Sequence, residues 1–258
     1  MQAQYTIDEH NFERQYLLAK MLAPLSLQAL QKVPLTQGAA ILDVACGIGE
    51  TSRLLHKHFE NVSVTGADLD NSLVQAARAQ TPPGLAVNFV AADASYLPFN
   101  DNSFDMVFSR YLLMHVPEAA VILREMKRVC KPGGIVFAQE PDISSSTCYP
   151  HSWAYDKIVE YFNALFVDGL VGRKLPALFS NAELRNINHS TGVAFEVADN
   201  SLRRMYTLTG EALEDALLSK RIATRQEYTA WVNELKRVEH DTGTVHLTHP
   251  VVAVWGVK

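Results

Sequence analysis

The chain alternates short apolar runs with stretches in which apolar residues recur every three or four positions. The runs predict buried strands over residues 40–44, 62–67, 86–90, 104–108 and 134–139. The helical spacing predicts helices over residues 12–31, 50–59, 72–79 and 118–130. Strands that alternate with helices in this way favour a parallel, doubly wound sheet with right-handed crossovers.

The last hundred residues depart from this alternation. Residues 193–197 and 251–255 predict two more strands, on either side of a mostly helical stretch in which Thr224 and Glu227 fit a capping box. We therefore expect an α/β fold, a doubly wound seven-stranded mixed sheet that ends in an antiparallel edge hairpin. The interpretation is one domain over residues 1–258. Its core spans about 36–142, and helical additions at about 1–33, 149–180 and 200–242 form a cap over the sheet edge where ligands bind.

Composition narrows the function classes without deciding between them. The 258 residues are 48% hydrophobic and 20% charged, which is typical of a globular protein. A net charge of −5 offers no basic stripe for nucleic acid. The start of the chain is polar and no apolar run is long enough to span a bilayer, so we expect a cytoplasmic protein without an integral membrane segment. The cysteines are widely spaced, and His56 and His58 point in different directions on their helix, so we expect no metal site.

The segment from Ile41 to Glu50 carries the strongest chemical signal. An apolar run leads through Asp43 into a turn that contains Gly47 and Gly49. Such glycines let the backbone approach a ligand, and an acidic residue about 20 positions further on, here Asp68, can bind ribose hydroxyls. The spacing indicates an adenosine-bearing cofactor. A nicotinamide-dependent oxidoreductase is the weaker alternative, because its turn would need a third glycine.

Further landmarks follow in order: Asp93 after the third strand, Leu97-Pro98-Phe99 before the fourth, and Lys131-Pro132-Gly133-Gly134 before the fifth. Together with the first turn, they resemble a class I S-adenosylmethionine-dependent methyltransferase of the small-molecule type. The resemblance covers about residues 39–140 and a matching C-terminal strand. It implies S-adenosyl-L-methionine as the cofactor, with Asp43 near its amino-acid end, Asp68 at the ribose and Asp93 at the adenine amino group.

The resemblance also implies a set of cofactor-binding residues. They are Asp43, Ala45, Cys46, Gly47, Gly49, Asp68, Leu69, Asp93, Ala94, Ser109 and Arg110. Ala45 stands where the family usually has its first glycine, a substitution that costs little if φ is negative there. Cys46 is expected to contribute mainly its backbone, and Asp70 to cap a helix rather than to bind a ligand. Asp68, at a loop edge, is expected to support little packing.

The sequence indicates the methyl acceptor less clearly than the cofactor. The family places the segment after the fourth strand near the transferable methyl, and His115 in that segment is the only candidate base. The alternative is that His115 packs or hydrogen-bonds structurally. Predicted substrate-binding residues are Tyr16, Tyr111, His115 and Trp153. Rings between 149 and 166, with others further on, could close over a small molecule, although most of such a stripe is ordinary core.

These observations predict an enzyme that transfers a methyl group from S-adenosylmethionine to a small molecule. The N-terminal helix, with Tyr5 and Tyr16, resembles the lid of family members that act on small molecules. Segment 109–112 lacks the acidic-or-Asn, Pro-Pro, aromatic motif of adenine-modifying methyltransferases, which argues against a DNA target. The alternative is a non-catalytic S-adenosylmethionine-binding sensor or partner subunit. The identity of the acceptor, the atom that is methylated and the oligomeric state stay open.

Overall fold

The computed structural model describes residues 9–196 and 201–258. Tyr5 and the outermost residues of two predicted cap segments, 1–8 and 200, lie outside this description. The main sheet has seven strands in the order β3-β2-β1-β4-β5-β10-β7. Their bounds are β3 Val87–Ala91, β2 Ser63–Asp68, β1 Ala40–Val44, β4 Phe104–Arg110, β5 Cys130–Pro141, β10 Val251–Val257 and β7 Arg185–Gly192. The first five in sequence run parallel, and β10 runs antiparallel to both neighbours, which confirms the predicted mixed sheet.

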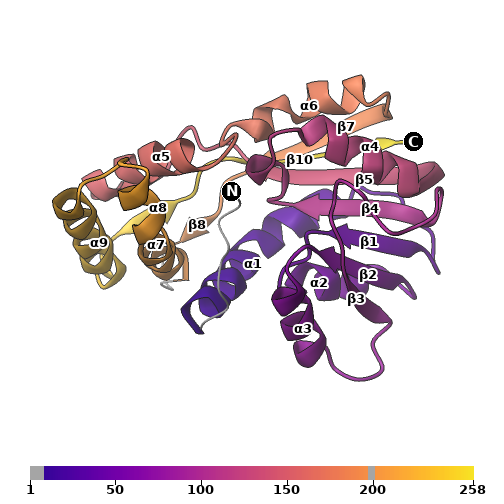
Figure 1. The fold of residues 1–258 in the computed structure, drawn as a ribbon, viewed down its shortest axis with the longest axis horizontal. Coiled ribbons are helices and arrows are strands. Elements are labelled where there is room, and N and C mark those ends of the chain that lie inside the picture. The colour runs from indigo at the N-terminus through magenta and orange to yellow at the C-terminus, as the bar shows by residue number, and fades with distance from the viewer. Residues whose placement is uncertain (1–8, 197–200) are drawn as a thin grey trace.

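Helices cover both faces of the main sheet (Figure 1). Alternation along a strand sends Ile41 into the hydrophobic cluster under one set of helices and Leu42 into the other cluster. Leu30, Leu55 and Val74 bring the first set onto the Ile41 side. The first set is α1 Glu9–Leu30, α2 Glu50–His58 and α3 Asn71–Gln80; the second is α4 Ala119–Val129 and α6 Val171–Asn181. None of the described helices has the length and apolarity needed to cross a membrane.

The remaining elements form a cap, which lies to the left of the main sheet in Figure 1, with α1 between the two. Its helices are α5 Trp153–Leu165, α7 Ser201–Ala212, α8 Glu214–Ser219 and α9 Arg225–Glu239. The predicted capping box of Thr224 and Glu227 opens α9. A small antiparallel sheet of β6 Thr147–Tyr149, β9 Val245–Leu247 and β8 Phe195–Glu196 was not predicted. Most of the aromatic stripe is core: Tyr155, Tyr161, Tyr206 and Trp231 are all buried.

The predicted partner of the last strand was wrong. The described part of the predicted strand, residues 193–196, does not pair with β10. The edge strand is β7, and Phe195 and Glu196 belong to the small sheet. β7 lies at the edge of the sheet, and most of its side chains are exposed. Ile187 is its only large apolar residue, so no apolar run in the sequence marks this strand. The two strands also form no hairpin, because the cap lies between them in sequence.

The turn predicted at residues 131–134 takes another form. Helix α4 stops at Val129 and β5 begins at the next residue. Phe104 pairs with Cys130 whereas Met106 pairs with Ile135, so the intervening residues of β5 form an irregularity within the strand. Gly133 has φ +79° there, a conformation that favours glycine.

Candidate active site at the carboxyl edge of the sheet

Strand register brings the predicted cofactor residues to one edge of the sheet. Val44, at the end of β1, pairs with Ala67 on one side and with Ser109 on the other. Asp68, at the end of β2, pairs with Ala91 at the end of β3. The residues that follow these strands therefore line the same edge, because parallel strands end together.

The loop after β1 turns through two left-handed glycines. Gly47 has φ +54° and Gly49 has φ +80°. A Cβ on Gly49 would lie 2.7 Å from Cζ of Phe89, so only glycine fits without movement of that ring. Cys46 donates its amide to the Ala67 carbonyl (3.0 Å), and burial raises the pKa of its thiol. A buried, protonated thiol agrees with a backbone contribution from Cys46.

Ala45 does not have the negative φ at which an alanine would cost little. Its φ is +61°, in the left-handed region, where the side-chain methyl crowds the backbone. The substitution of alanine for the family's first glycine therefore costs about 1–2 kcal/mol of backbone strain. The sequence could not reveal the positive φ of Ala45, because the shape of the loop depends on the positions of β2 and α2 in the fold.

Asp43 and Arg110 place opposite charges next to one another at the ends of β1 and β4. The Asp43 carboxylate accepts a hydrogen bond from Ser52 Oγ (2.6 Å). Burial raises its pKa to about 7, although that hydrogen bond and the Arg110 charge both pull the pKa down. Arg110 is itself desolvated, and burial lowers the pKa of its guanidinium.

A serine of α1 holds Arg110 in place. Arg110 donates from Nη1 to Ser26 Oγ (3.1 Å), and Ser26 donates to Gln139 Oε1 (2.6 Å). Ser26 is fully buried, so this chain of bonds joins α1 to the ends of β4 and β5 away from solvent. Nothing in the local sequence around Ser26 marks it as a partner of residues more than eighty positions away.

Asp68 supports more of the loop than the sequence indicated. Its Oδ2 accepts from the Gly47 amide (2.8 Å) and its Oδ1 from the Asp70 amide (3.0 Å). Burial raises its pKa, while these amide bonds oppose the shift. The expectation that Asp68 supports little packing was wrong, because it ties the glycine turn to the end of β2. Leu69 beside it is 52% exposed, an apolar surface at the edge.

Asp70 and Asp93 each accept hydrogen bonds from a serine two residues further on. Asp70 accepts from the Ser72 amide (2.8 Å), which confirms its predicted role as the N-cap of α3. Asp93 accepts from both the amide and the hydroxyl of Ser95, a hydroxyl bond that lowers the carboxyl pKa. Both bonds use Oδ1, and no hydrogen bond from the described part of the chain reaches Oδ2. Contact of Asp93 with adenine therefore stays a prediction.

Ala94 and Ser109 lie on either side of the same edge. Ala94 is partly buried and packs against the larger hydrophobic cluster. Ser109 is fully buried at the end of β4, and its Oγ has no hydrogen-bond partner among the residues that the structure describes. A buried hydroxyl without a partner is costly, so this is a place where a bound polar group would be stabilising.

The segment after β4 forms a tight turn around a carboxylate that sequence reasoning missed. Glu140, at the end of β5, accepts from the amides of Leu112 (2.9 Å) and Leu113 (2.8 Å), which open the 3₁₀ turn η1 Leu113–His115. It is completely buried, and burial raises its pKa to about 7. Tyr111 precedes the turn with φ +56°, a strained value for a bulky residue. Glu140 thus fixes the backbone beside the expected acceptor.

His115 lies at the end of this turn. Its ring meets Phe166 edge-on, with centroids 5.1 Å apart. His115 is exposed at the surface, while desolvation of its ring by the neighbouring protein, with a smaller effect from the Arg14 charge, shifts its pKa downward. The ring contact favours the packing alternative, and the role of a base stays a prediction.

The last two predicted acceptor residues are exposed. Tyr16 on α1 is 47% exposed, and Trp153 at the start of α5 is 43% exposed. No hydrogen bond or ring contact within the described ranges joins Trp153 to Tyr111 or His115. Both residues stay predictions for substrate binding.

His249 is a second residue that sequence reasoning missed. Its Nε2 lies 3.1 Å from the Tyr111 hydroxyl, and it is 4% exposed. The residue precedes β10, whose antiparallel direction puts its first residues at the carboxyl edge of β5, where Val251 pairs with Pro141. The signal available in the sequence was therefore a polar residue just before, rather than after, the last strand.

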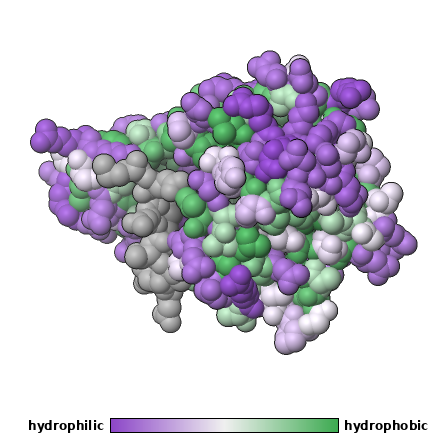
Figure 2. All heavy atoms as spheres, turned by 45° about the vertical axis from the view of Figure 1, so that its right-hand side comes forward, coloured by the Kyte–Doolittle hydropathy of each residue, from purple (hydrophilic) through white to green (hydrophobic). Residues whose placement is uncertain are grey.

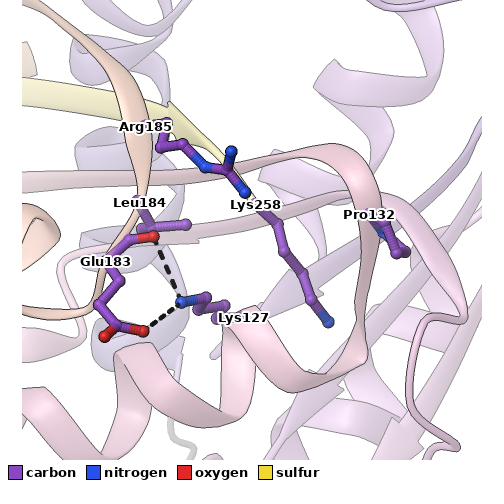
Figure 3. A pocket seen from close by; sticks show the side chains of 6 residues that line it. All are labelled: Lys127, Pro132, Glu183, Leu184, Arg185 and Lys258. Atoms are coloured by element: carbon purple, nitrogen blue, oxygen red, sulfur yellow. Dashed lines mark hydrogen bonds and ion pairs between the residues drawn. The ribbon is translucent and has the colours of Figure 1, made fainter.

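A hollow of about 530 Å³ lies elsewhere, around Lys127, Glu183, Arg185 and Lys258 (Figure 3). It lies at the starts of β5 and β7 and the end of β10, away from the cofactor residues. Lys127 donates to the Ala182 carbonyl (2.7 Å), and Lys258 to Asn102 Oδ1 (2.7 Å). Both ammonium groups thus stabilise the surrounding loops, and this hollow is not the candidate active site.

Residues 42–138 match the family model described as a methyltransferase domain. The chain is 43% identical over 102 residues to 2-methyl-6-phytyl-1,4-hydroquinone methyltransferase of Synechocystis, which spans 40% of this chain and 32% of that protein. It is 32% identical over 142 residues to demethylmenaquinone methyltransferase of Staphylococcus aureus, which spans 54% of this chain and 59% of that protein. Over these residues the chain is similar to methyltransferases. The alignments span less than two thirds of these curated relatives.

Solved structures show the same fold over nearly the whole chain. The YcgJ protein of Bacillus subtilis aligns over 92% of this chain and 97% of its own, with a TM-score of 0.59 and 18% identity. Phosphoethanolamine N-methyltransferase 2 of Haemonchus contortus, solved with S-adenosyl-L-methionine, aligns over 98% of this chain and 60% of its own, with a TM-score of 0.58 and 19% identity. The predicted Rossmann-like methyltransferase fold is confirmed.

Proposed function

We propose that this protein is an enzyme that transfers a methyl group from S-adenosyl-L-methionine to a small molecule. The observation that carries the proposal is the sheet edge itself. There Asp43, Arg110, the Gly47 turn and Asp68 converge directly beside the segment from Tyr111 to His115. The match of residues 42–138 to a methyltransferase domain supports the reaction class, and the names of the curated relatives support a small acceptor.

The residues at this edge fit the proposed cofactor. The buried Asp43 carboxylate, whose pKa is raised to about 7, is well placed for an ammonium group. The desolvated Arg110 guanidinium beside it suits a carboxylate, so the pair matches an amino-acid end. Asp68 can accept from ribose hydroxyls, and the exposed Leu69 side chain offers an apolar surface to a purine.

The cofactor would supply a methyl group already activated by its sulfonium. The protein then needs chiefly to hold the acceptor and the methyl carbon in line and to exclude water. The glycine turn and Asp68 would fix one end of the cofactor, and the turn held by Glu140 would fix the backbone next to the acceptor. Positioning of this kind can supply most of the acceleration, and a base is needed only for an acceptor that must lose a proton early.

We place the activity in the cytoplasm on the basis of the sequence alone, with no nucleic-acid partner. Hydrophobic patches on the face that Figure 2 shows are interrupted by hydrophilic residues. The non-catalytic alternative, a sensor or a partner subunit, has no observation that favours it.

Melting temperature provides the first test of the proposal. S-adenosylmethionine and S-adenosylhomocysteine should each raise it, because a ligand that binds the native state stabilises it by mass action, whereas NAD should not. Asp68→Asn should abolish most of the shift. It should also lower the melting temperature of the free protein, since the Gly47 and Asp70 amides lose a carboxylate partner. A shift with NAD alone would refute the proposed cofactor, and cofactor binding with no methyl transfer to any screened phenol, amine or thiol would favour the sensor.

A further inference from the structure

Tyr111 and His249 form a hydrogen-bonded pair on the acceptor side of the candidate site. The Tyr111 hydroxyl lies 3.1 Å from His249 Nε2, and the two rings are 6.2 Å apart, tilted by 35°. The His249 side chain is buried, and its Nδ1 has no hydrogen-bond partner in the described part of the chain. Two features that are costly in a ligand-free protein, a strained Tyr111 backbone and an unpartnered imidazole nitrogen, therefore meet in one pair.

The charged groups around the pair are already engaged. Glu140 accepts from the amides of η1, and both oxygens of Asp142 accept from Arg173 (2.6 and 2.7 Å). Arg110 is held by Ser26 and faces Asp43. A cationic acceptor would need a carboxylate with open positions, and an anionic acceptor a spare cation. The surroundings instead favour a neutral polar group.

The neighbouring side chains favour an aromatic acceptor. Tyr111, Leu112 and Phe166 pack against the larger hydrophobic cluster, and Phe166 presents its ring edge-on to His115. Ring surfaces of this kind bind flat apolar bodies, while a tyrosine hydroxyl supplies one directional bond. In either tautomer of neutral His249, the Tyr111 oxygen keeps one hydrogen-bonding capacity for a ligand.

We propose that Tyr111, positioned by His249, recognises a neutral aromatic hydroxyl on the methyl acceptor, as in a phenol or a hydroquinone. This inference rests on the proposed function and adds the chemical class of the acceptor. Tyr111 is the residue that determines specificity, and His249 is a positioning residue that acts through it.

The same pair gives the acceptor proton a route. The substrate O–H proton passes to Tyr111 Oη while the Tyr111 proton passes to His249 Nε2, leaving a phenolate and an imidazolium. Burial lowers the pKa of His249 to about 4, so the resting imidazole is neutral. In the tautomer that carries its proton on Nδ1, Nε2 can take up the tyrosine proton transiently. The Asp142 carboxylate acts in the opposite direction on that pKa and would stabilise the imidazolium that forms.

The test compares two aromatic probes in the presence of S-adenosylhomocysteine. One is 1,4-naphthohydroquinone, kept reduced by dithionite, and the other is 1,4-dimethoxynaphthalene, in which the hydroxyls are capped. The hydroquinone should bind the wild-type protein more tightly than the dimethoxy compound. Tyr111→Phe should weaken hydroquinone binding about tenfold and leave the dimethoxy compound unchanged, because one hydrogen bond to a ligand is removed while the ring is kept.

Tyr206→Phe is the matched control. Tyr206 is also buried, and its hydroxyl contacts Ser146 Oγ (3.0 Å) rather than His249. It should leave the affinity for both probes unchanged. His249→Ala should reproduce the loss seen in Tyr111→Phe, and His249→Gln should restore most of it by giving the tyrosine hydroxyl a partner again.

The outcomes separate this inference from the proposed function. If S-adenosylhomocysteine raises the melting temperature of every variant but the two probes bind the wild type equally, the acceptor class is wrong and the cofactor assignment stands. Equal losses in Tyr111→Phe and Tyr206→Phe would also overturn the inference. If S-adenosylhomocysteine fails to bind the wild type, the proposed function itself fails.

Discussion

At Ala45, where the family usually has a glycine, the backbone takes a left-handed conformation. The residue follows Val44, whose pairing on both sides fixes where the strand ends, so the loop cannot relax to a negative φ without moving β1. Strain stored at a ligand-binding turn is a recurrent feature of functional sites. Here it also offers a direct measurement.

Ala45→Gly should stabilise the protein by about 0.5–1 kcal/mol, because the relief of left-handed strain exceeds the entropy that glycine loses on folding. Urea denaturation would measure the change in the free energy of unfolding. Ala92→Gly is the control: Ala92 is similarly half-buried and is not among the residues with positive φ, so it should lose stability instead. Loss of stability in both variants would show that Ala45 is unstrained.

We expect Asp43 to link cofactor binding to pH. Its pKa is about 7 in the free protein, and a bound ammonium group would favour the ionised carboxylate. Affinity for S-adenosylhomocysteine should therefore rise about tenfold from pH 6 to pH 8, with protons released on binding. Calorimetry in buffers of different ionisation enthalpy measures both quantities. Asp43→Asn should bind weakly with no such pH dependence, and a pH dependence that survived in it would assign the titration to another group.

Residues next to the glycine turn could be predicted because their partners lie nearby in sequence. Asp43 and Asp68 follow directly from strand ends that the apolar runs mark. Ser26, Glu140 and His249 could not, because each acts on a residue that only the sheet order brings close. Sequence spacing reports local geometry, whereas these contacts depend on strand order and direction.

At the scale of elements, α1 contacts both the cap and the candidate site. Near its start, Glu13 pairs with Arg204 of α7 (3.0 Å). Two residues on, Gln15 reaches the glycine loop, where a Cβ on Gly47 would lie 3.0 Å from Gln15 Oε1. Ser26 holds Arg110 further along the helix. The helix expected to act as a lid therefore contacts the glycine loop and Arg110, and its role as a lid stays a proposal.

Ser26→Ala should test that contact. Removing the hydroxyl frees the Arg110 guanidinium, so affinity for S-adenosylhomocysteine should fall about five- to tenfold through one lost charge-assisted bond. Methylthioadenosine lacks the amino-acid end and should bind the variant and the wild type equally. Calorimetry with both ligands gives the comparison, and an equal loss for both would mean that Ser26 supports the fold of the site rather than Arg110.

The polar strand β7 and the small sheet of the cap could not be predicted from the pattern of apolar residues. Apolar runs identified every strand buried in the centre of the main sheet. The edge strand β7, and two- or three-residue strands such as β8 and β9, carry too few apolar residues to form a run. Their pairing is set by tertiary contacts, so the sequence could predict that a cap exists but not how it is built.

At the scale of the whole molecule, the cap and the main sheet share one hydrophobic cluster. Leu42 and Val136 of the sheet belong to the same cluster as Tyr161 and Trp231 of the cap. The two parts should therefore unfold together, as a single domain of this size often does. This supports the predicted single domain over residues 1–258, which stays a proposal.

Two tryptophans can report on that cooperativity. Trp231 lies in the cap and Trp255 in β10, and both are buried. In a background with Trp153→Phe, the single-tryptophan variants Trp231→Phe and Trp255→Phe should show the same urea midpoint after correction for their different stabilities. An earlier transition for the Trp231 signal, with circular dichroism still changing afterwards, would show that the cap unfolds on its own.

The central place of β10 bears on how the protein forms during translation. The strand pairs with β5 on one side and β7 on the other, and it supplies Val254 to one hydrophobic cluster and Trp255 to the other. Both flanking strands leave the ribosome well before residues 251–257 do. Until then the backbone groups of β5 and β7 that face β10 are unpaired, and such groups are prone to pair with other chains. Early chaperone binding to the nascent chain would protect this gap until the last strand closes it.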